Sequence, residues 1–201
     1  MSDLIFENAN WIWYDKSYGK NEYGEFCDAI NYAGKKTVLR ISVCGDYTLF
    51  VNGKYVASNQ YGDFPHYKVY DEIDITEHLE PGENRICFLV WYFDDFGMRY
   101  YTPSAGLIYE VEVDGKIIAK SCENTLSRKS RAYKSGDEKV ISVQLGYSFA
   151  YDAKKEDNWL FENADDFSSS HIISKECEFF KRPIKKTDTW RNPKGRNHKN
   201  R

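Results

Sequence analysis

The stretch GDYTLFVNGKYVAS, residues 45–58, decides the fold class of this chain. It holds two short runs of alternating apolar and polar residues, and Asn52-Gly53 separates them. A two-residue type I′ turn needs positive φ at both central positions, and an Asn-Gly pair adopts that conformation at low cost. The stretch therefore predicts an antiparallel β-hairpin. Because side chains on a strand alternate between two faces, this turn also fixes which residues point into the core.

Further strands and turns follow the same logic on both sides of this hairpin. Residues 37–43 (TVLRISV) alternate weakly and predict a strand just before it. The runs LIYEVEV (107–113) and KIIAKS (116–121) flank Asp114-Gly115, which predicts a second hairpin with the same turn chemistry. Residues 139–146 (KVISVQLG) predict one more strand.

A buried strand and a long loop are predicted between the two hairpins. Residues 74–79 (DITEHL) predict one helical turn, which Pro81 ends. Pro81-Gly82 has the residue order of a type II turn and leads into RICFLVWY, residues 85–92. Both faces of this run are apolar, so we expect a strand that is buried on both sides. The following residues 93–104 predict a long loop, and such loops often carry function.

Many short strands with turn signals and almost no helical periodicity predict an all-β fold, an antiparallel β-sandwich with little helix. We expect the sandwich to span residues 1–186 and a basic, disordered tail to span 187–201. Residues 181–201 hold nine Lys and Arg against one Asp. A basic tail can bind nucleic acid, but this one lacks apolar periodicity and is typical of an untethered end. Nucleic acid is therefore not an expected partner.

Composition narrows the class of protein further. The chain has 16 Tyr, 12 Phe and 5 Trp, which fits either a β-rich core or exposed rings that contact a flat, amphipathic ligand such as a sugar. No secretory signal and no apolar run of membrane-spanning length is present, so no membrane partner is expected. The cysteine spacing fits neither a disulfide framework nor a zinc site. It predicts buried, reduced thiols of a cytoplasmic protein at Cys27, Cys44, Cys87, Cys122 and Cys177.

Catalytic and metal-binding motifs are missing from the sequence. It contains no GxSxG, HExxH, Walker or GxGxxG pattern, and its four histidines are scattered. Asp94 and Asp95 follow the buried strand, but adjacent residues of a strand point to opposite faces, whereas glycoside hydrolysis needs two facing carboxyl groups. In a loop these acids could instead bind calcium or sugar hydroxyls. We therefore assign no catalytic residue, no metal site and no cofactor.

Several segments, taken in their order, are similar to one known family. The segments are NWIWYD (10–15), NEYGEFCDAINY (21–32), LRISVCGDYTLFVNGKYVAS (39–58), VYDEIDITEHLEPGENRICFLVWYF (69–93) and AGLIYEVEV (105–113), with weaker similarity in 144–159 and 182–184. Together they resemble the N-terminal β-sandwich module of bacterial α-L-rhamnosidases. The resemblance implies a galactose-binding-like or jelly-roll accessory module whose partners are downstream domains. It transfers no catalytic residue, because the family's catalytic acids lie in a downstream barrel.

The loops after the first hairpin and after the buried strand are the predicted ligand site. A ring can cover the apolar face of a sugar while carboxylates accept from its hydroxyls. The alternative is that these rings pack against neighbouring domains. Whether the two loops converge at one end of the sandwich stays open. The candidates are Tyr61, Phe64, His66 and Tyr67 in the first loop and Asp94, Asp95, Arg99 and Tyr100 in the second.

Three functions remain open from the sequence. The first is a non-catalytic accessory module of an α-L-rhamnosidase-like glycoside hydrolase, for domain packing, for contact with a carbohydrate such as a rhamnose-containing glycan, or for both. The second is a free-standing, lectin-like carbohydrate-binding protein. The third is a glycosidase in its own right, for which the sequence identifies no carboxylate pair.

Overall fold

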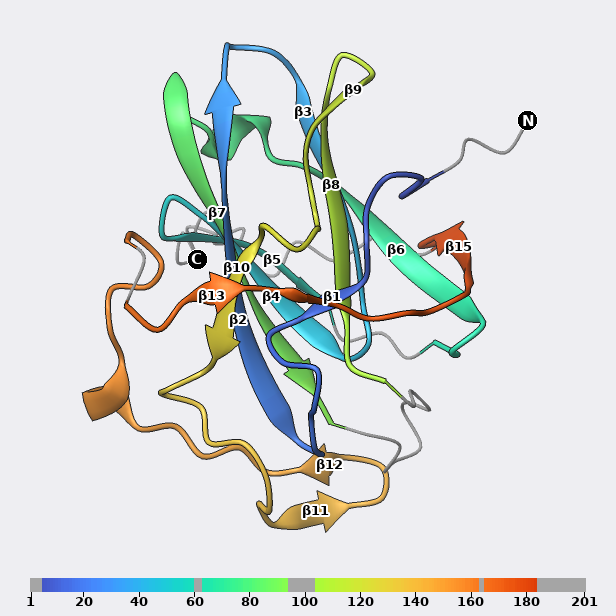
Figure 1. Cartoon of the computed structure of the whole chain (residues 1–201), viewed down its shortest axis with the longest axis vertical. Helices are drawn as coiled ribbons and strands as arrows, with labels where there is room; N and C mark the ends of the chain where they lie inside the picture. Colours follow the sequence, from blue (N-terminus) through green and yellow to red (C-terminus); the bar gives the residue numbers. More distant parts are fainter. Residues whose placement is uncertain (1–4, 60–62, 94–103, 163–164, 184–201) are drawn as a thin grey trace, which may run out of the picture.

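A computed structural model describes residues 5–59, 63–93, 104–162 and 165–183. Within these ranges the chain folds as two large β-sheets that pack face to face and a small two-stranded sheet, and helix is limited to two single turns (Figure 1). The expected all-β sandwich is confirmed. In this part of the chain, no helix has the length and apolar character needed to cross a membrane.

One sheet has seven strands in the order β14-β1-β8-β3-β6-β15, with β9 also paired to β8. Its pairs are antiparallel except for β6 and β15, which run parallel. The strand bounds are β1 Ile12–Trp13, β3 Thr37–Val43, β6 Tyr67–Asp74, β8 Leu107–Val113, β9 Lys116–Lys120, β14 His171–Ile172 and β15 Glu178–Lys181.

The other sheet has six antiparallel strands in the order β13-β10-β2-β7-β4-β5. Its centre is the pair β2 and β7, which match over their full length from Glu22 opposite Tyr92 to Tyr32 opposite Gly82. The bounds are β2 Glu22–Tyr32, β4 Asp46–Val51, β5 Lys54–Asn59, β7 Gly82–Tyr92, β10 Leu126–Lys129 and β13 Ser168–Ser169.

The predicted turns form where the sequence places them. Asn52 and Gly53 have φ values of 50° and 74°, and Asp114 and Gly115 have 49° and 76°. Positive φ at both positions is the signature of the type I′ turn. Gly82 has φ 98° at the third position of the predicted type II turn. The helical turn expected at residues 74–79 is the 3₁₀ turn η1, Thr76–His78, and a second turn, η2, spans Ala153–Lys155.

The single strand predicted at residues 139–146 is wrong. The segment folds back on itself, and β11 (Val140–Ser142) pairs antiparallel with β12 (Gly146–Tyr147). Gly146 has φ 76°, and the Leu145 amide donates to Ser142 Oγ at 3.1 Å, so the chain reverses inside the apolar run. The apolar residues Val143 and Leu145 of this segment are exposed rather than buried, so they do not mark a core strand.

The main core lies between the two sheets. The inward rows come from β2, β4 and β7 on one side and from β1, β3 and β8 on the other. Phe88 of β7 meets Tyr109 of β8 across this core, with ring centroids 4.7 Å apart. The outward row of β7 is covered unevenly, because Cys87 is buried whereas Leu89 and Trp91 are half-buried. The expected burial of this strand on both sides therefore holds only in part.

Residues 157–162 and 165–167 cover one half of the outer face of the six-stranded sheet. Arg128 of β10 donates to Glu25 Oε2 at 2.7 Å and binds the Asp157 carboxylate through both terminal nitrogens, at 2.7 and 2.8 Å. Trp159 is buried against Cys27 and Cys87 in the same region. The other half of this face, near the end of the sheet where β2 begins, keeps an opening whose lining includes Tyr147 of β12.

Two further predictions concern the C-terminal boundary of the domain and the burial of the cysteines. The boundary at residue 186 and the tail 187–201 lie outside the described residues and stay predictions. Among the five cysteines, Cys27, Cys44 and Cys87 are buried as expected, whereas Cys122 and Cys177 are half-buried.

Candidate functional site

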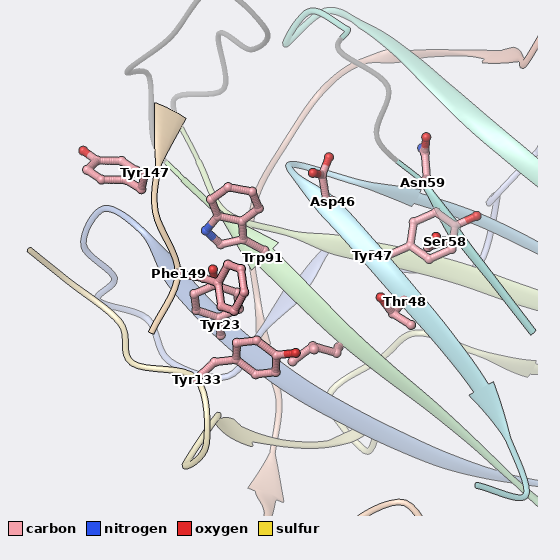
Figure 2. A pocket seen from close by; sticks show the side chains of 11 residues that line it. Tyr23, Asp46, Tyr47, Thr48, Ser58, Asn59, Trp91, Tyr133, Tyr147 and Phe149 are labelled. Atoms are coloured by element: carbon pink, nitrogen blue, oxygen red, sulfur yellow. The ribbon is translucent and has the colours of Figure 1, made fainter. Parts of the chain in front are cut away.

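A pocket of about 280 Å³ opens on the outer face of the six-stranded sheet. Its lining comes from four strands and from the segment that follows β10 (Figure 2). Aromatic side chains gather on one side and mostly polar side chains on the other. The lining residues are Tyr23, Asp46, Tyr47, Thr48, Ser58, Asn59, Leu89, Trp91, Tyr133, Tyr147 and Phe149.

The aromatic wall is a stack of three rings. Tyr23 and Trp91 are directly opposite in the β2–β7 register, and their rings lie parallel within 4° at a centroid distance of 5.8 Å. Tyr133 stacks on the same Tyr23 ring, at 4.9 Å and 21°. Phe149 lies 6.5 Å from Tyr133 and is 70% exposed. The wall therefore offers flat apolar surface to a ligand from both strand and loop residues.

Asn21 forms hydrogen bonds with both segments that carry the rings of this wall. Its Oδ1 accepts from Trp91 Nε1 at 2.8 Å, and its Nδ2 donates to the Gly136 carbonyl at 2.9 Å. Asn21 is fully buried and has φ 51°, a left-handed conformation that asparagine tolerates better than most residues. The Tyr23 amide also donates to Ser135 Oγ at 3.1 Å. These bonds fix the segment that carries Tyr133 against the strand that carries Trp91.

The polar wall comes from β4 and β5. Asp46 and Thr48 point outward on β4 because Tyr47 and Leu49 take the alternate, core-facing positions. Ser58 of β5 is directly opposite Thr48. Register thus places a carboxylate and hydroxyls opposite the stacked rings.

The phenols of Tyr23 and Tyr133 in the pocket stay protonated at physiological pH. Burial raises the pKa of Tyr23 far above its ordinary value of 10.0, and neighbouring Tyr133 and Asp46 raise it further. Burial also raises the pKa of Tyr133. Protonated phenols can both donate and accept hydrogen bonds.

This arrangement suits a ligand that is apolar on one face and rich in hydroxyls at its edge. Aromatic rings can cover carbon-bound hydrogens, while Asp46, Thr48, Ser58 and the phenols exchange hydrogen bonds. Asp46 is the one carboxylate among the described lining residues.

The structure describes three of the eight predicted site residues, and none of the three lines the pocket. Phe64 is 60% exposed and stacks with His66 at 6.1 Å. Tyr67 stacks on Phe180 at 3.9 Å, where β6 meets β15 in the other sheet. The other candidates, Tyr61, Asp94, Asp95, Arg99 and Tyr100, lie outside the described residues. All eight stay predictions as ligand contacts.

The strands that feed the two predicted loops end side by side. Tyr47 of β4 is opposite both Asn59 of β5 and Val90 of β7. Since both neighbours run antiparallel to β4, the ends of β5 and β7 lie at the same edge of the sheet. The first loop follows Asn59 and the second follows Phe93, so both start next to the pocket. Both predicted loops therefore begin at the same end of the sheet.

Sequence reasoning missed the aromatic wall. The sequence predicts that Trp91 lies in a strand buried on both sides, so nothing in it indicates that the indole is half-exposed and can contact a ligand. Tyr133 and Phe149 lie in irregular segments, and only their packing on Tyr23 brings them to the site. The one available signal was the alternation in residues 85–92, whose outer row ends in Trp91.

Comparison with known proteins gives this sandwich a family. The family model described as "Alpha-L-rhamnosidase N-terminal domain" matches residues 33–186. The chain belongs to the α-L-rhamnosidase N-terminal domain family. The resemblance inferred from the ordered segments is thereby confirmed, and the chain is an accessory β-sandwich domain of this type.

Solved rhamnosidases share the fold. The GH78 family rhamnosidase of Bacillus sp. GL1 is 26% identical, with a TM-score of 0.81 over 89% of this chain and 20% of its own. The α-L-rhamnosidase from Dictyoglomus thermophilum is 18% identical, with a TM-score of 0.68 over 86% of this chain and 22% of its own. The N-terminal domain chain thus spans about a fifth of the length of these two enzymes.

A lectin has a similar fold. The apo form of the Pleurotus ostreatus lectin is 16% identical, with a TM-score of 0.51 over 83% of this chain and 42% of its own. At this identity the likeness concerns the fold alone. No curated protein matches this rhamnosidase N-terminal domain chain.

Proposed function

We propose that this domain binds a carbohydrate in the aromatic pocket and serves as the sugar-contacting accessory module of an α-L-rhamnosidase-like glycoside hydrolase. The observation that carries the proposal is the ring stack of Tyr133, Tyr23 and Trp91, which faces the polar side chains Asp46 and Thr48. The β-sandwich that the chain shares with a lectin is compatible with this role. A rhamnose-containing glycan is the proposed ligand, given the family to which the domain belongs.

The proposed affinity is weak. A pocket of about 280 Å³ is at the small end of ligand sites, so it accommodates little more than one sugar ring. Partial burial of such a ligand is consistent with a dissociation constant in the millimolar range, about −4 kcal/mol. Weak single-site binding suits a module that holds a glycan near a catalytic domain in the same chain, because tethering raises the effective concentration.

Titration of the purified chain with L-rhamnose and with galactose, followed by NMR, tests this proposal. The indole N–H of Trp91 is the reporter, since the indole belongs to the ring stack and its N–H donates to Asn21. We expect saturable chemical-shift changes at Trp91 and Tyr133, and none at Trp159 on the covered half of the same face. Binding that shifts Trp159 alone, or no shift at high sugar concentration, would exclude the pocket as the sugar site.

Domain packing is the second candidate function, and the hairpin β11–β12 favours it. Ile141, Val143 and Leu145 are 57%, 51% and 58% exposed within this short hairpin, and Phe149, which follows it in the chain, is 70% exposed. Exposed apolar patches of this kind are typical of protein interfaces. Limited proteolysis tests it: the hairpin should be cut in this chain and protected in a longer rhamnosidase chain that contains the same domain. Equal cleavage in both chains would contradict the packing role.

A further inference from the structure

The six-stranded sheet holds a pair of cysteines that the pocket does not use. Cys27 of β2 and Cys87 of β7 are directly opposite in register, and their Sγ atoms lie 2.9 Å apart. The two residues are 2% and 1% exposed. Opposite residues on antiparallel strands have Cα atoms about 4.5–5.5 Å apart, which is inside the range that a disulfide spans.

We propose that Cys27 and Cys87 form a reversible disulfide bond between the two central strands when the chain is exposed to a disulfide oxidant of the glutathione type. The Sγ atoms need to approach by roughly 1 Å to reach the bond length of about 2.05 Å. Because the backbones are already paired at this position, side-chain rotation supplies most of that movement. A sequence separation of 60 residues hides this pair from any spacing rule.

The surroundings of the two sulfurs tolerate loss of their protons. Cys27 Sγ lies 3.7 Å and Cys87 Sγ 3.9 Å from the Trp159 carbonyl oxygen, which can accept from either thiol. Arg85 donates to the same oxygen from Nε at 3.2 Å and from a terminal nitrogen at 2.9 Å. The carbonyl therefore keeps two strong donors after oxidation, and the disulfide leaves no buried acceptor without a partner.

The reaction balances as two thiol–disulfide exchanges. One cysteine thiolate attacks glutathione disulfide, forms a mixed disulfide and releases one glutathione thiolate. The second cysteine thiolate then attacks the protein sulfur of that mixed disulfide, forms the Cys27–Cys87 bond and releases the second glutathione. The two cysteines lose two protons and two electrons, and glutathione disulfide is reduced to two glutathiones. Burial and the neighbouring Cys87 raise the pKa of the Cys27 thiol, so oxidation of the folded chain is slow and oxidation during folding is faster.

The disulfide would also stabilise the β2–β7 strand pair that carries Tyr23 and Trp91 of the pocket. Along the outward rows of β2 and β7, Cys27 opposite Cys87 is followed by Glu25 opposite Leu89 and then by Tyr23 opposite Trp91. The disulfide therefore lies on the same face as the ring stack, roughly 13 Å along the strands. A covalent link at this point excludes slippage of the register that brings Tyr23 and Trp91 together.

Oxidative refolding of the full chain from urea tests the proposal. Refolding in glutathione buffers of increasing disulfide content gives both sulfurs access to the oxidant, and free thiols are then alkylated and counted by mass spectrometry. We expect the five thiols of the reduced chain to fall to three, a peptide pair joining Cys27 to Cys87, and a rise in Tm on the order of 10 °C. Cys27→Ser and Cys87→Ser should each abolish both the loss of two thiols and the rise in Tm, whereas Cys122→Ser should keep both.

Two results would overturn the proposal. One is a refolded chain in which Cys27 and Cys87 are both alkylated at every buffer composition, including those in which glutathione disulfide is in large excess. The other is a disulfide that joins a different pair, such as Cys44 with Cys177, while Cys27 and Cys87 remain free. Reversal of the Tm rise by dithiothreitol in the wild type separates the disulfide from irreversible oxidation.

Discussion

Tyr23 and Trp91 face each other across the central strands β2 and β7, with ring planes 4° apart and centroids 5.8 Å apart. Their positions follow from the hydrogen-bond register of a strand pair that matches over its full length. This pair of rings within the stack is thus built on the most regular part of the sheet, and Tyr133 from an irregular segment packs onto it. A site on rigid elements loses little conformational freedom when a ligand binds, which favours binding by a small ligand.

The exposed ring at the mouth of the pocket should contribute to sugar affinity without contributing to stability. Phe149 is 70% exposed and lines the pocket, whereas Phe161 is 68% exposed and does not. Phe149→Ala should weaken sugar binding by about 5-fold or more, because one ring contact is lost, corresponding to about 1 kcal/mol. The matched control Phe161→Ala should leave the NMR titration unchanged. An equal loss of affinity in both variants would contradict a role for this pocket.

The approach of β4 to β7 should depend on a glycine. Gly45 has φ 148°, and a Cβ at this position would lie 1.9 Å from the Trp91 carbonyl oxygen, a backbone atom of a central strand. Gly45→Ala should therefore cost about 3 kcal/mol of unfolding free energy, since only a displacement of β4 relieves the clash. Urea unfolding monitored by fluorescence measures this cost.

Gly82→Ala is the matched control for Gly45→Ala. Gly82 also has positive φ, 98°, but a Cβ there would meet nothing within 4 Å. Its cost should be limited to backbone strain, about 1 kcal/mol. Equal costs in the two variants would show that the close approach to Trp91 does not matter for stability.

The parts of the fold that the sequence predicts are those with local causes. Asn52-Gly53 and Asp114-Gly115 determine their hairpins within a few residues, so both turns form as expected. By contrast, β2 contains the buried acid Glu25, which finds Arg128 and Ser130 as partners more than 100 positions away. No short-range pattern contains that information.

The candidate site is less predictable for the same reason. The sequence left open whether the two predicted loops begin at one end of the sheet, because their starting points depend on a strand order that only the fold reveals. The wall itself depends on Asn21, which bonds to Gly136 at a separation of 115 residues and so brings Tyr133 onto Tyr23. The sequence around a residue in an irregular segment has no periodicity from which its neighbours in space can be predicted. Only the folded structure therefore shows that Tyr133 and Phe149 line the pocket.

Removal of one partner of the buried ion pair between Lys68 and Asp63 should destabilise the fold, whereas removal of both partners should be tolerated. The side chains are 0% and 4% exposed, and Lys68 Nζ also donates to the Val43 carbonyl at 2.9 Å. Asp63→Ala should cost about 3–5 kcal/mol, because it removes the buried carboxylate that is ion-paired with the buried ammonium of Lys68. The double variant Asp63→Ala with Lys68→Met should recover most of this loss, since it removes both charges.

A surface pair provides the control for the buried one. Glu80 lies 3.9 Å from Lys54, and the two side chains are 72% and 71% exposed. Glu80→Ala should change the unfolding free energy by less than about 1 kcal/mol. Urea unfolding of all three variants measures these values, and failure of the double variant to recover stability would show that Lys68 acts through other contacts.

The covered half of the outer face should lose stability in acid through Asp157. Its carboxylate accepts two hydrogen bonds from Arg128, and these lower the pKa of Asp157 below its ordinary value of 3.8. A lowered pKa in the folded state means that the unfolded state binds protons first as the pH falls. The stabilisation is therefore complete above pH 3.8 and is lost as the pH falls through the lowered pKa of the folded chain.

Comparison of the wild type with Asp157→Asn tests this pH dependence. At neutral pH the variant should be less stable by about 2 kcal/mol, since hydrogen bonds to a charged group are lost from a buried arginine. The difference should shrink steadily below pH 3.8, because the unfolded wild-type chain takes up a proton at Asp157 first and the folded chain does so only below its lowered pKa. Asp137→Asn should give a much smaller difference, because the ion pair of Asp137 with Lys20 is exposed to solvent and the Asp137 side chain is 89% exposed. A gap between wild type and Asp157→Asn that stays constant into strong acid would mean that the carboxylate charge does not stabilise this face.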